Sequence, residues 1–376
     1  MTVPLQPLPS IFSAPALPAP VRFPLGWLLD HGGPALQYRA ICEVAKLPLP
    51  PRLPALSYAQ PAALRLALTQ RTDGTWGSTM LGVPTGAKGE GHSAVGLVPG
   101  VRRLLECGWD RESPPLVRAR RLLFRLLAED DDPAYLFEFG REVAKNEELA
   151  RLRRGLLREA AAATLAQAGY ETDPRLRGAA RRILERVTEF LRSPLAQKPW
   201  VRVGNKQVLA AEASPPSVYA LTMLAYMPLF RSENYGAMER LYRHLTGPLP
   251  RQESMQLCGE EIVPVPHLVL GDQLPHRNAA DADVPAALAW LEVMARLNFL
   301  RRNENWGKLF DRFLDDRDRD GVWHPHKGME VPSSPSPYVW PTFPLEDGAA
   351  PEARWTDVTF RLGLISRLAG RPIELV

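Results

Sequence analysis

The chain has 376 residues, more than a single hydrophobic core usually holds unless repeated units each add their own share of core. Hydrophobic residues make up 45% and charged residues 23%, as in ordinary soluble proteins, and the net charge of +4 is too small to suggest a nucleic-acid partner. No run approaches the roughly 18 apolar residues of a membrane span, and the first residues lack a signal-peptide pattern. We therefore expect a cytoplasmic protein, without a disulfide framework because its three cysteines are far apart.

A sequence repeat of about 60 residues is the clearest organising feature of the chain. Residues 108–123 and 169–184 align without a gap, and each segment begins with a glycine, an aromatic residue and an acidic residue. A unit of this length is too long for one helix and suits a pair of helices with a long return loop. Gly108 and Gly169 would each follow a helix, at the position where a left-handed residue commonly ends it.

Apolar helical stretches alternate with arginine-rich ones along the chain. The apolar stretches are approximately 35–47, 92–107, 154–168, 217–230, 284–297 and 356–369. Polar stretches follow the first five of them, at approximately 61–70, 116–129, 175–191, 235–245 and 301–314. The alternation indicates that one set is buried and the other faces water. We predict an all-α fold, an (α/α)6 toroid of helical hairpins; the alternative is a HEAT-type solenoid, whose repeat is closer to about 40 residues.

Proline is unusually frequent, with 38 residues against a usual share of about 5%. The prolines cluster at the N-terminus and between the apolar stretches. We expect residues 1–30 to form a Pro-rich N-terminal strap, extended across the outside of the ring, and residues 31–376 to form a single toroid domain. A peripheral membrane contact by the strap is the second interpretation. A short hairpin is expected at about 200–210.

A glutamine–glycine–tryptophan motif follows the first polar stretch, where residues 70–77 read QRTDGTWG. Its spacing resembles the QW motif of squalene–hopene and oxidosqualene cyclases and of their toroidal relatives, the β subunits of protein prenyltransferases. Residues 318–323, DRDGVW, resemble a second copy that lacks the glutamine. In that superfamily the motif is structural, because the glycine permits a tight turn and the indole stacks on the neighbouring repeat. The resemblance implies the toroid and a central cavity for a hydrophobic, isoprenoid-type molecule.

The DxDD signature of the class II terpene cyclases is missing, and the closest approach is Asp281 and Asp283 before the fifth apolar stretch. As an acid pair at the mouth of the ring, Asp281 or Asp283 would donate a proton, with Asp357 as its partner. The alternative is that the pair caps the helix and compensates its dipole. The Asp, Cys and His that bind zinc in prenyltransferases are not reproduced either. We therefore expect no metal and no cofactor.

Further polar and aromatic residues would gather near these aspartates if the inner helices run parallel. The candidate substrate-binding residues are His92, Tyr219, Trp323, His324 and Trp355. For the Trp323 corner, the alternative is a packed indole with exposed histidines. The segment from Cys258 to His276 mixes several types of metal ligand, but its spacing fits no zinc pattern, and an irregular loop with local hydrogen bonds is the other interpretation.

Three functions follow from these observations. The first is a terpene-cyclase-like enzyme that binds an isoprenoid-type substrate and starts a cyclisation or isomerisation with an aspartic acid. The second is a non-catalytic binding or scaffold protein that keeps the fold. The third is a carbohydrate-active (α/α)6 enzyme with paired carboxylates. A closed apolar cavity would favour the first, and an open groove lined by tryptophans and aspartates would favour the third. The expected partner is a hydrophobic small molecule, and the sequence does not indicate the oligomeric state.

Overall fold

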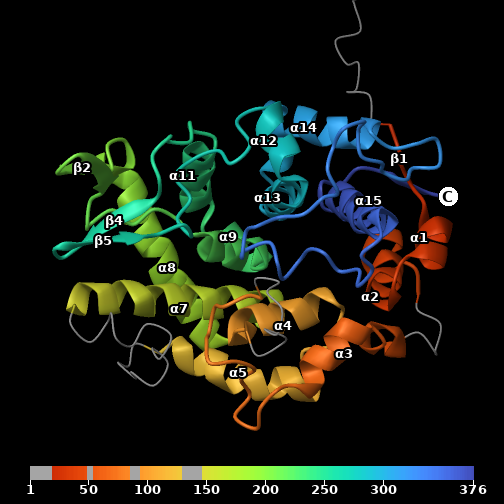
Figure 1. The fold of residues 1–376 in the computed structure, drawn as a ribbon. Coiled ribbons are helices and arrows are strands. Elements are labelled where there is room, and N and C mark those ends of the chain that lie inside the picture. The colour runs from red at the N-terminus through yellow and green to blue at the C-terminus, as the bar shows by residue number, and fades with distance from the viewer. Residues whose placement is uncertain (1–18, 49–53, 85–93, 129–145) are drawn as a thin grey trace, which may run out of the picture.

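The structure is a computed structural model that describes residues 19–48, 54–84, 94–128 and 146–376 (Figure 1). It is mostly helical, which confirms the predicted helical class. Each predicted apolar stretch contains a helix, and we call this set the apolar helices. They are α2 Pro34–Arg39 with its π-helical continuation η1 Ala40–Ala45, α4 Leu97–Glu106, α7 Glu147–Gln167, α9 Val218–Ala225, α13 Val284–Arg296 and α15 Pro351–Leu368.

From α4 onward the apolar helices contact one another in chain order. Helix α4 packs on α7, α7 on α9, α9 on α13, α13 on α15, and α15 on η1 (Figure 1). Every residue of α7 from Glu159 to Ala166 is buried, and four of them are the consecutive alanines 160–163. Small side chains allow neighbouring helices to approach closely, so this part of α7 packs against α9 along its buried length. These contacts form the main hydrophobic core.

The arginine-rich stretches also form helices, and each buries one face only. They are α3 Pro61–Leu68, α5 Pro114–Leu126, α8 Pro174–Arg192, α11 Tyr235–Leu245 and α14 Glu304–Asp315. In α8 the buried residues recur every three or four positions, from Leu176 to Phe190, as one face of an amphipathic helix requires. The predicted alternation is therefore confirmed. The described residues also form shorter helices: α1 Leu25–His31, η2 Pro54–Tyr58, η5 Pro194–Ala196, α10 Pro228–Glu233, α12 Arg277–Ala282 and η6 Leu300–Arg302.

Glycine corners end α4 and α7 as predicted. Gly108 and Gly169 have φ of +83° and +81°, in the left-handed region that favours glycine. After each, the next amide reaches back to close the helix, as in the 3.1 Å hydrogen bond from Trp109 N to Leu104 O. Asn298, with φ +61°, takes the same place after α13, and Phe299 supplies the aromatic residue. The repeat thus includes a unit in which asparagine replaces glycine.

The tryptophan corner ties successive units together. Gln70 Nε2 donates to Gly74 O at 3.0 Å and to Pro115 O, at the start of α5, at 2.9 Å. Trp76 is buried, and its Nε1 donates to Leu66 O of α3 at 2.6 Å. In the second corner Trp323 is fully buried, and its backbone N donates to Thr359 Oγ1 of α15 at 2.9 Å. Both tryptophans serve packing between units.

A small four-stranded sheet lies beside the helices, in the order β2-β3-β4-β5. Strands β2 Trp200–Val203 and β3 Lys206–Leu209 form the predicted hairpin. A second hairpin, β4 Met255–Cys258 and β5 Glu261–Pro264, lies in the segment that was expected to be irregular. Its two-residue turn contains Gly259 at φ +62°, a conformation typical of tight hairpins.

The two ends of the described chain lie side by side. Strand β1 Val21–Phe23 pairs in parallel with β6 Ile373–Leu375. The chain then forms α1, so the segment from Leu25 is helical where an extended strap was expected. The reason is local burial: Leu28 is completely buried, and α1 packs against α15 and η1. Residues 1–18 of the predicted strap lie outside the described residues.

Candidate functional site

Four buried and two partly exposed ionisable side chains meet between the apolar helices. We call them the central charge cluster: Arg39, Glu106, Glu292 and Arg361, which are buried, and Glu43 and Arg296, which are partly exposed. Arg39 and Glu43 come from α2 and η1, and Glu106 is the last residue of α4. Glu292 and Arg296 lie in the last turns of α13, and Arg361 lies in α15. Four apolar helices, with η1 counted as the continuation of α2, therefore contribute to one cluster.

The cluster is a chain of alternating charges. Arg39 donates from Nε and Nη2 to the two oxygens of Glu43, at 2.6 and 2.8 Å, and from Nη1 to Glu106 Oε2 at 2.6 Å. Arg361 then joins Glu106 Oε2 and Glu292 Oε2, each at 2.7 Å. Arg296 Nε closes the chain on Glu292 Oε1 at 3.0 Å. Three arginines and three glutamates thus balance one another in charge.

Burial makes this pairing necessary. Arg39 and Arg361 are each 3% exposed, and Glu106 is 2% exposed. Burial alone would raise the pKa of Glu106, but Arg39 and Arg361 outweigh that effect and hold the pKa well below its usual range. For Arg296, burial would lower the pKa, but Tyr226 and Glu292 outweigh it and raise the pKa. Glu106 therefore stays ionised and holds no proton to donate at neutral pH.

Uncharged groups extend the cluster to the remaining apolar helices. Gln167, the last residue of α7, donates from Nε2 to Glu106 Oε1 at 2.7 Å and accepts from Arg102 Nε of α4 at 2.9 Å. Tyr226 follows α9, and the guanidinium of Arg296 lies 4.4 Å from its ring centroid. Burial raises the pKa of the Tyr226 phenol, so the group is neutral. All the apolar helices thus place a residue in the cluster or next to it.

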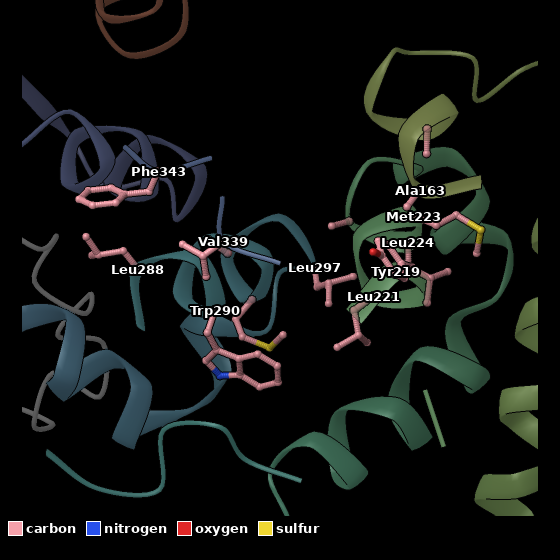
Figure 2. Close-up of a cluster of buried hydrophobic side chains, with 14 of the residues drawn as sticks. Ala163, Tyr219, Leu221, Met223, Leu224, Leu288, Trp290, Leu297, Val339 and Phe343 are labelled. Carbon is pink, nitrogen blue, oxygen red and sulfur yellow. The ribbon is translucent and has the colours of Figure 1, made fainter. Parts of the chain in front are cut away.

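A cavity of about 400 Å³ lies between α9 and α13, and the loop segments 266–273 and 336–342 complete its wall. We call it the apolar cavity. Leu221 of α9, Trp290 of α13 and Val339 belong to its lining, and Figure 2 shows them among the buried side chains of these elements. Its charged lining residues are Arg102, Glu292 and Arg296. The volume lies within the range of about 300–1,000 Å³ typical of small-molecule sites.

A second cavity, the polar cavity, has a volume of about 570 Å³. Its lining includes the charge-cluster residues Arg39, Glu43, Glu106 and Arg296, and the aromatic residues Tyr38, Tyr58, Trp109 and Tyr226. Tyr226 and Arg296 line both cavities. The charge cluster therefore lies where an apolar space and a polar space come together.

The predicted acids Asp281 and Asp283 lie away from these cavities' linings. Asp281 pairs with Arg312 of α14, with 3.0 Å between Oδ2 and Nη1, and this hydrogen bond lowers its pKa. Asp283 caps α13: its Oδ1 accepts from Ala286 N at 2.8 Å, and its Oδ2 accepts from Ser334 Oγ at 2.7 Å. Asp283 therefore acts as a helix cap, as in the capping interpretation, whereas Asp281 forms an ion pair.

Asp357, the expected partner, is buried in α15 at 1% exposure. It accepts from Leu345 N at 2.7 Å and pairs with Arg354 Nη1 at 3.1 Å, and burial raises its pKa. These contacts include neither of the other predicted acids. Tyr219 is also buried, and its ring meets that of Tyr338, a lining residue of the apolar cavity, at 5.9 Å. His92 lies outside the described residues.

The other predicted binding residues surround the second tryptophan corner. His324 and Trp355 lie close together, with ring centroids 4.7 Å apart, and His324 Nε2 is 2.9 Å from Asp318 Oδ2. Trp323 is fully buried beside them in sequence. None of the three belongs to the lining of the apolar cavity. Packing of the corner, the alternative weighed above, accounts for their contacts.

The segment from Cys258 to His276 contains the turn of the second hairpin, strand β5 and a largely buried loop. Cys258 ends β4, and burial lowers the pKa of His267 to about 4. Asp272 accepts a 2.9 Å hydrogen bond from Trp306 Nε1. Among the described residues, no group of three or more His, Cys, Asp and Glu side chains is placed to hold a metal ion. The polar groups of the segment form local hydrogen bonds, in agreement with the second interpretation, a loop without a metal site.

The charge cluster itself was not predicted. Its signal is nevertheless present in the sequence, because Arg39, Glu106, Glu292 and Arg361 are charged residues inside otherwise apolar helical stretches. A charge on a buried face needs a partner of opposite charge, so the presence of several such residues predicts that they pair with one another across the core. The prediction took all residues inside the apolar stretches to be core residues, and it sought the candidate acids at the starts of the helices instead.

Comparisons of the chain with models of protein families, with curated proteins and with solved structures find no match. The resemblance of the tryptophan corners to the cyclase superfamily therefore stays a prediction. Within the described ranges, no helix is long and apolar enough to cross a membrane.

Proposed function

We propose that the chain is an (α/α)6 toroid, divergent from the terpene cyclases, that binds a largely apolar, isoprenoid-type small molecule in the apolar cavity. The observation that carries this proposal is the composition of the cavity wall. Leucine, valine, alanine, proline and tryptophan side chains make up most of it, and its charged groups all belong to the central charge cluster or adjoin it. Such a wall favours a ligand with an apolar body and one polar end.

Two relationships support the toroid. From α4 onward the apolar helices contact one another in chain order, and the last of them, α15, contacts η1. Between the first two, Arg39 of α2 donates a hydrogen bond to Glu106 of α4. The second tryptophan corner is also adjacent to the start of the described chain, since a Cβ added to Gly321 would lie 2.8 Å from Arg22 O. The Trp76 corner, which follows α3, contacts the next unit at α5. The Trp323 corner, which follows α14, contacts the first unit of the chain. These contacts support a closed ring of units.

The acid-initiated reaction expected from the sequence has less support. It needs a carboxylic acid that faces the ligand, and Asp281, Asp283 and Asp357 are not among the residues that line the apolar cavity. Glu292 does line it, but it is paired with Arg296 and Arg361. We therefore favour ligand binding without acid-initiated cyclisation, and turnover of the ligand is one outcome of the test below.

A carbohydrate-active enzyme is the remaining alternative, and the polar cavity is its natural site because carboxylates and aromatic rings line it together. A glycosidase needs one carboxylic acid that keeps its proton near neutral pH. Arg39 outweighs the effect of burial and lowers the pKa of Glu43, and Glu106 is held ionised as described above. The acid that this chemistry requires is thus not provided by either glutamate.

Binding of farnesol, a neutral isoprenoid alcohol, tests the proposal. Thermal unfolding of the full chain should shift upward with farnesol concentration, because a ligand that binds only the folded state stabilises it. Ala289→Trp, which places a large ring on the cavity wall, should abolish the shift. Leu68→Trp, which adds the same ring to the exposed face of α3, should keep it. Circular dichroism checks that both variants fold.

The outcomes separate the candidate functions. No shift with farnesol in the unsubstituted chain, or an undiminished shift in Ala289→Trp, would overturn the proposed site. Conversion of farnesol or a related polyene to a new product, detected by mass spectrometry, would establish the enzyme instead. A shift produced by oligosaccharides but not by farnesol would favour the carbohydrate-active alternative.

A further inference from the structure

Arg102 is a buried cation whose charge the central charge cluster does not balance. It lies in α4 and is 7% exposed. Its Nε donates to the neutral Gln167 Oε1 at 2.9 Å, and no carboxylate of the described residues forms an ion pair with it. The three arginines and three glutamates of the cluster already neutralise one another. Arg102 therefore adds one uncompensated positive charge to the interior.

Such a charge is unfavourable unless something pairs with it. A buried cation without a partner loses its hydration and gains no Coulomb energy in return. The fork of the guanidinium is well suited to two parallel hydrogen bonds with a carboxylate, and no described residue occupies the two Nη groups of Arg102. Since Arg102 lines the apolar cavity, a ligand in that cavity can reach it.

We infer that the ligand of the apolar cavity is a monocarboxylate, with its carboxylate on Arg102 and its apolar body against α9 and α13. The inference rests on the proposed function, because it assigns the polar end of the same ligand. A single negative charge matches Arg102, since Arg296, the other cation among the described residues of the wall, is paired with Glu292. A phosphate dianion would leave an excess negative charge beside Glu292, which lines the same cavity.

Farnesoate and farnesol give a matched pair of probes, because they share the apolar body and differ in the head group. Isothermal titration of the full chain at pH 7.5 should show that farnesoate binds at least about tenfold more tightly than farnesol. Arg102→Gln should abolish this preference, so that this variant binds farnesoate no more tightly than farnesol. Arg118→Gln, which makes the same charge change on the exposed face of α5, should retain the preference.

Arg102→Lys provides a second variant, which keeps the charge but loses the fork, and should reduce the preference in part. It also keeps the test open if Arg102→Gln does not fold. Equal binding of the two probes, tighter binding of farnesyl phosphate than of farnesoate, or an unchanged preference in both Arg102 variants would overturn the inference. If farnesol binds and farnesoate does not, the inference is wrong but the proposed function stands. If neither probe binds, the result counts against the proposed function itself.

Discussion

Arg361 donates a 2.7 Å hydrogen bond to Glu106, although the two residues are 255 positions apart in the chain. Arg39 donates to the same oxygen of Glu106 at 2.6 Å. One carboxylate oxygen thus joins α2, α4 and α15, the first, second and last of the apolar helices. In the interior this arrangement is stable only while each charge keeps its partners, because desolvation is costly for an unpaired ion.

Loss of the Glu106 charge should therefore be strongly destabilising. Glu106→Gln leaves two buried guanidinium groups short of a counter-charge, and breaking a buried pair in this way costs about 3–5 kcal/mol. Urea denaturation measures the change in unfolding free energy. Glu112→Gln is the matched control, since Glu112 has a side chain that is 58% exposed and should change stability by no more than about 0.5 kcal/mol. Similar losses in the two variants would contradict the structural role of the cluster.

Alanine substitutions at two glycines should separate the effect of backbone conformation on stability from the effect of helix propensity. Gly169→Ala forces a left-handed residue at φ +81° and should destabilise the protein by about 1–2 kcal/mol. Gly178→Ala, in the middle of α8, has no neighbour closer than 3.8 Å to the added Cβ and should stabilise it by about 0.4–1 kcal/mol. Thermal unfolding of the two variants should shift in opposite directions. Shifts of the same sign would show that the corner does not hold the predicted conformation.

Glu346 should make stability depend on pH near neutrality. Burial raises its pKa to about 7, while its carboxylate accepts a hydrogen bond from Gly33 N at 2.6 Å. The folded state then holds a proton at a pH where the unfolded chain, with a pKa of 4.5, has released it. Stability from this group is therefore present below about pH 4.5 and is lost as the pH rises through about 7.

Glu346→Gln removes this titration and should flatten the dependence of the melting temperature between pH 5 and pH 8. Asp357 and Asp347 raise the pKa of Glu346 further, whereas Arg354 lowers it, so the difference between the unsubstituted chain and the variant is the quantity to compare. An unchanged pH profile in the variant would assign the dependence to other groups.

Asp283 allows the predicted catalytic role to be separated from helix capping. Asp283→Ala removes the acceptor of the Ala286 amide and should cost about 0.5–2 kcal/mol, whereas Asp283→Asn keeps a capping oxygen and should be nearly neutral. Farnesol binding should be unaffected in Asp283→Asn, because the residue lies outside the cavity wall. If a reaction is found and Asp283→Asn abolishes it with the stability unchanged, the catalytic prediction is correct after all.

Local signals predicted the helices well and their ends less well. The end of α4 at Gly108 and the hairpin at 200–210 followed from turn chemistry that acts within a few residues. Helix α7 begins at Glu147, earlier than the predicted residue 154, because charged residues in its first turns hid the apolar pattern. The corner at Asn298 was overlooked because asparagine adopts the left-handed conformation less often than glycine does.

The grouping of the candidate acids rested on a different kind of argument. Asp281, Asp283 and Asp357 were grouped because each stands near the start of an apolar stretch, but the direction of a side chain depends on what packs around it. Arg312, Ala286 and Arg354 supply the contacts that occupy these carboxylates. The Asp281–Arg312 pair cannot be read from spacing, since its partner comes from another helix. Those contacts of Asp283 and Asp357 are local, each with a partner three residues away, and the capping alternative foresaw the first of them.

The amino-acid sequence by itself determined the alternation of buried and exposed helices and the corners that end them, because periodicity and turn conformation depend on residues close together in the chain. Only the tertiary structure decided where the charges go. Arg39, Glu106, Glu292 and Arg361 lie in different helices, and their pairing depends on the packing that brings those helices together. The same packing leaves Arg102 without a counter-charge at the wall of the apolar cavity.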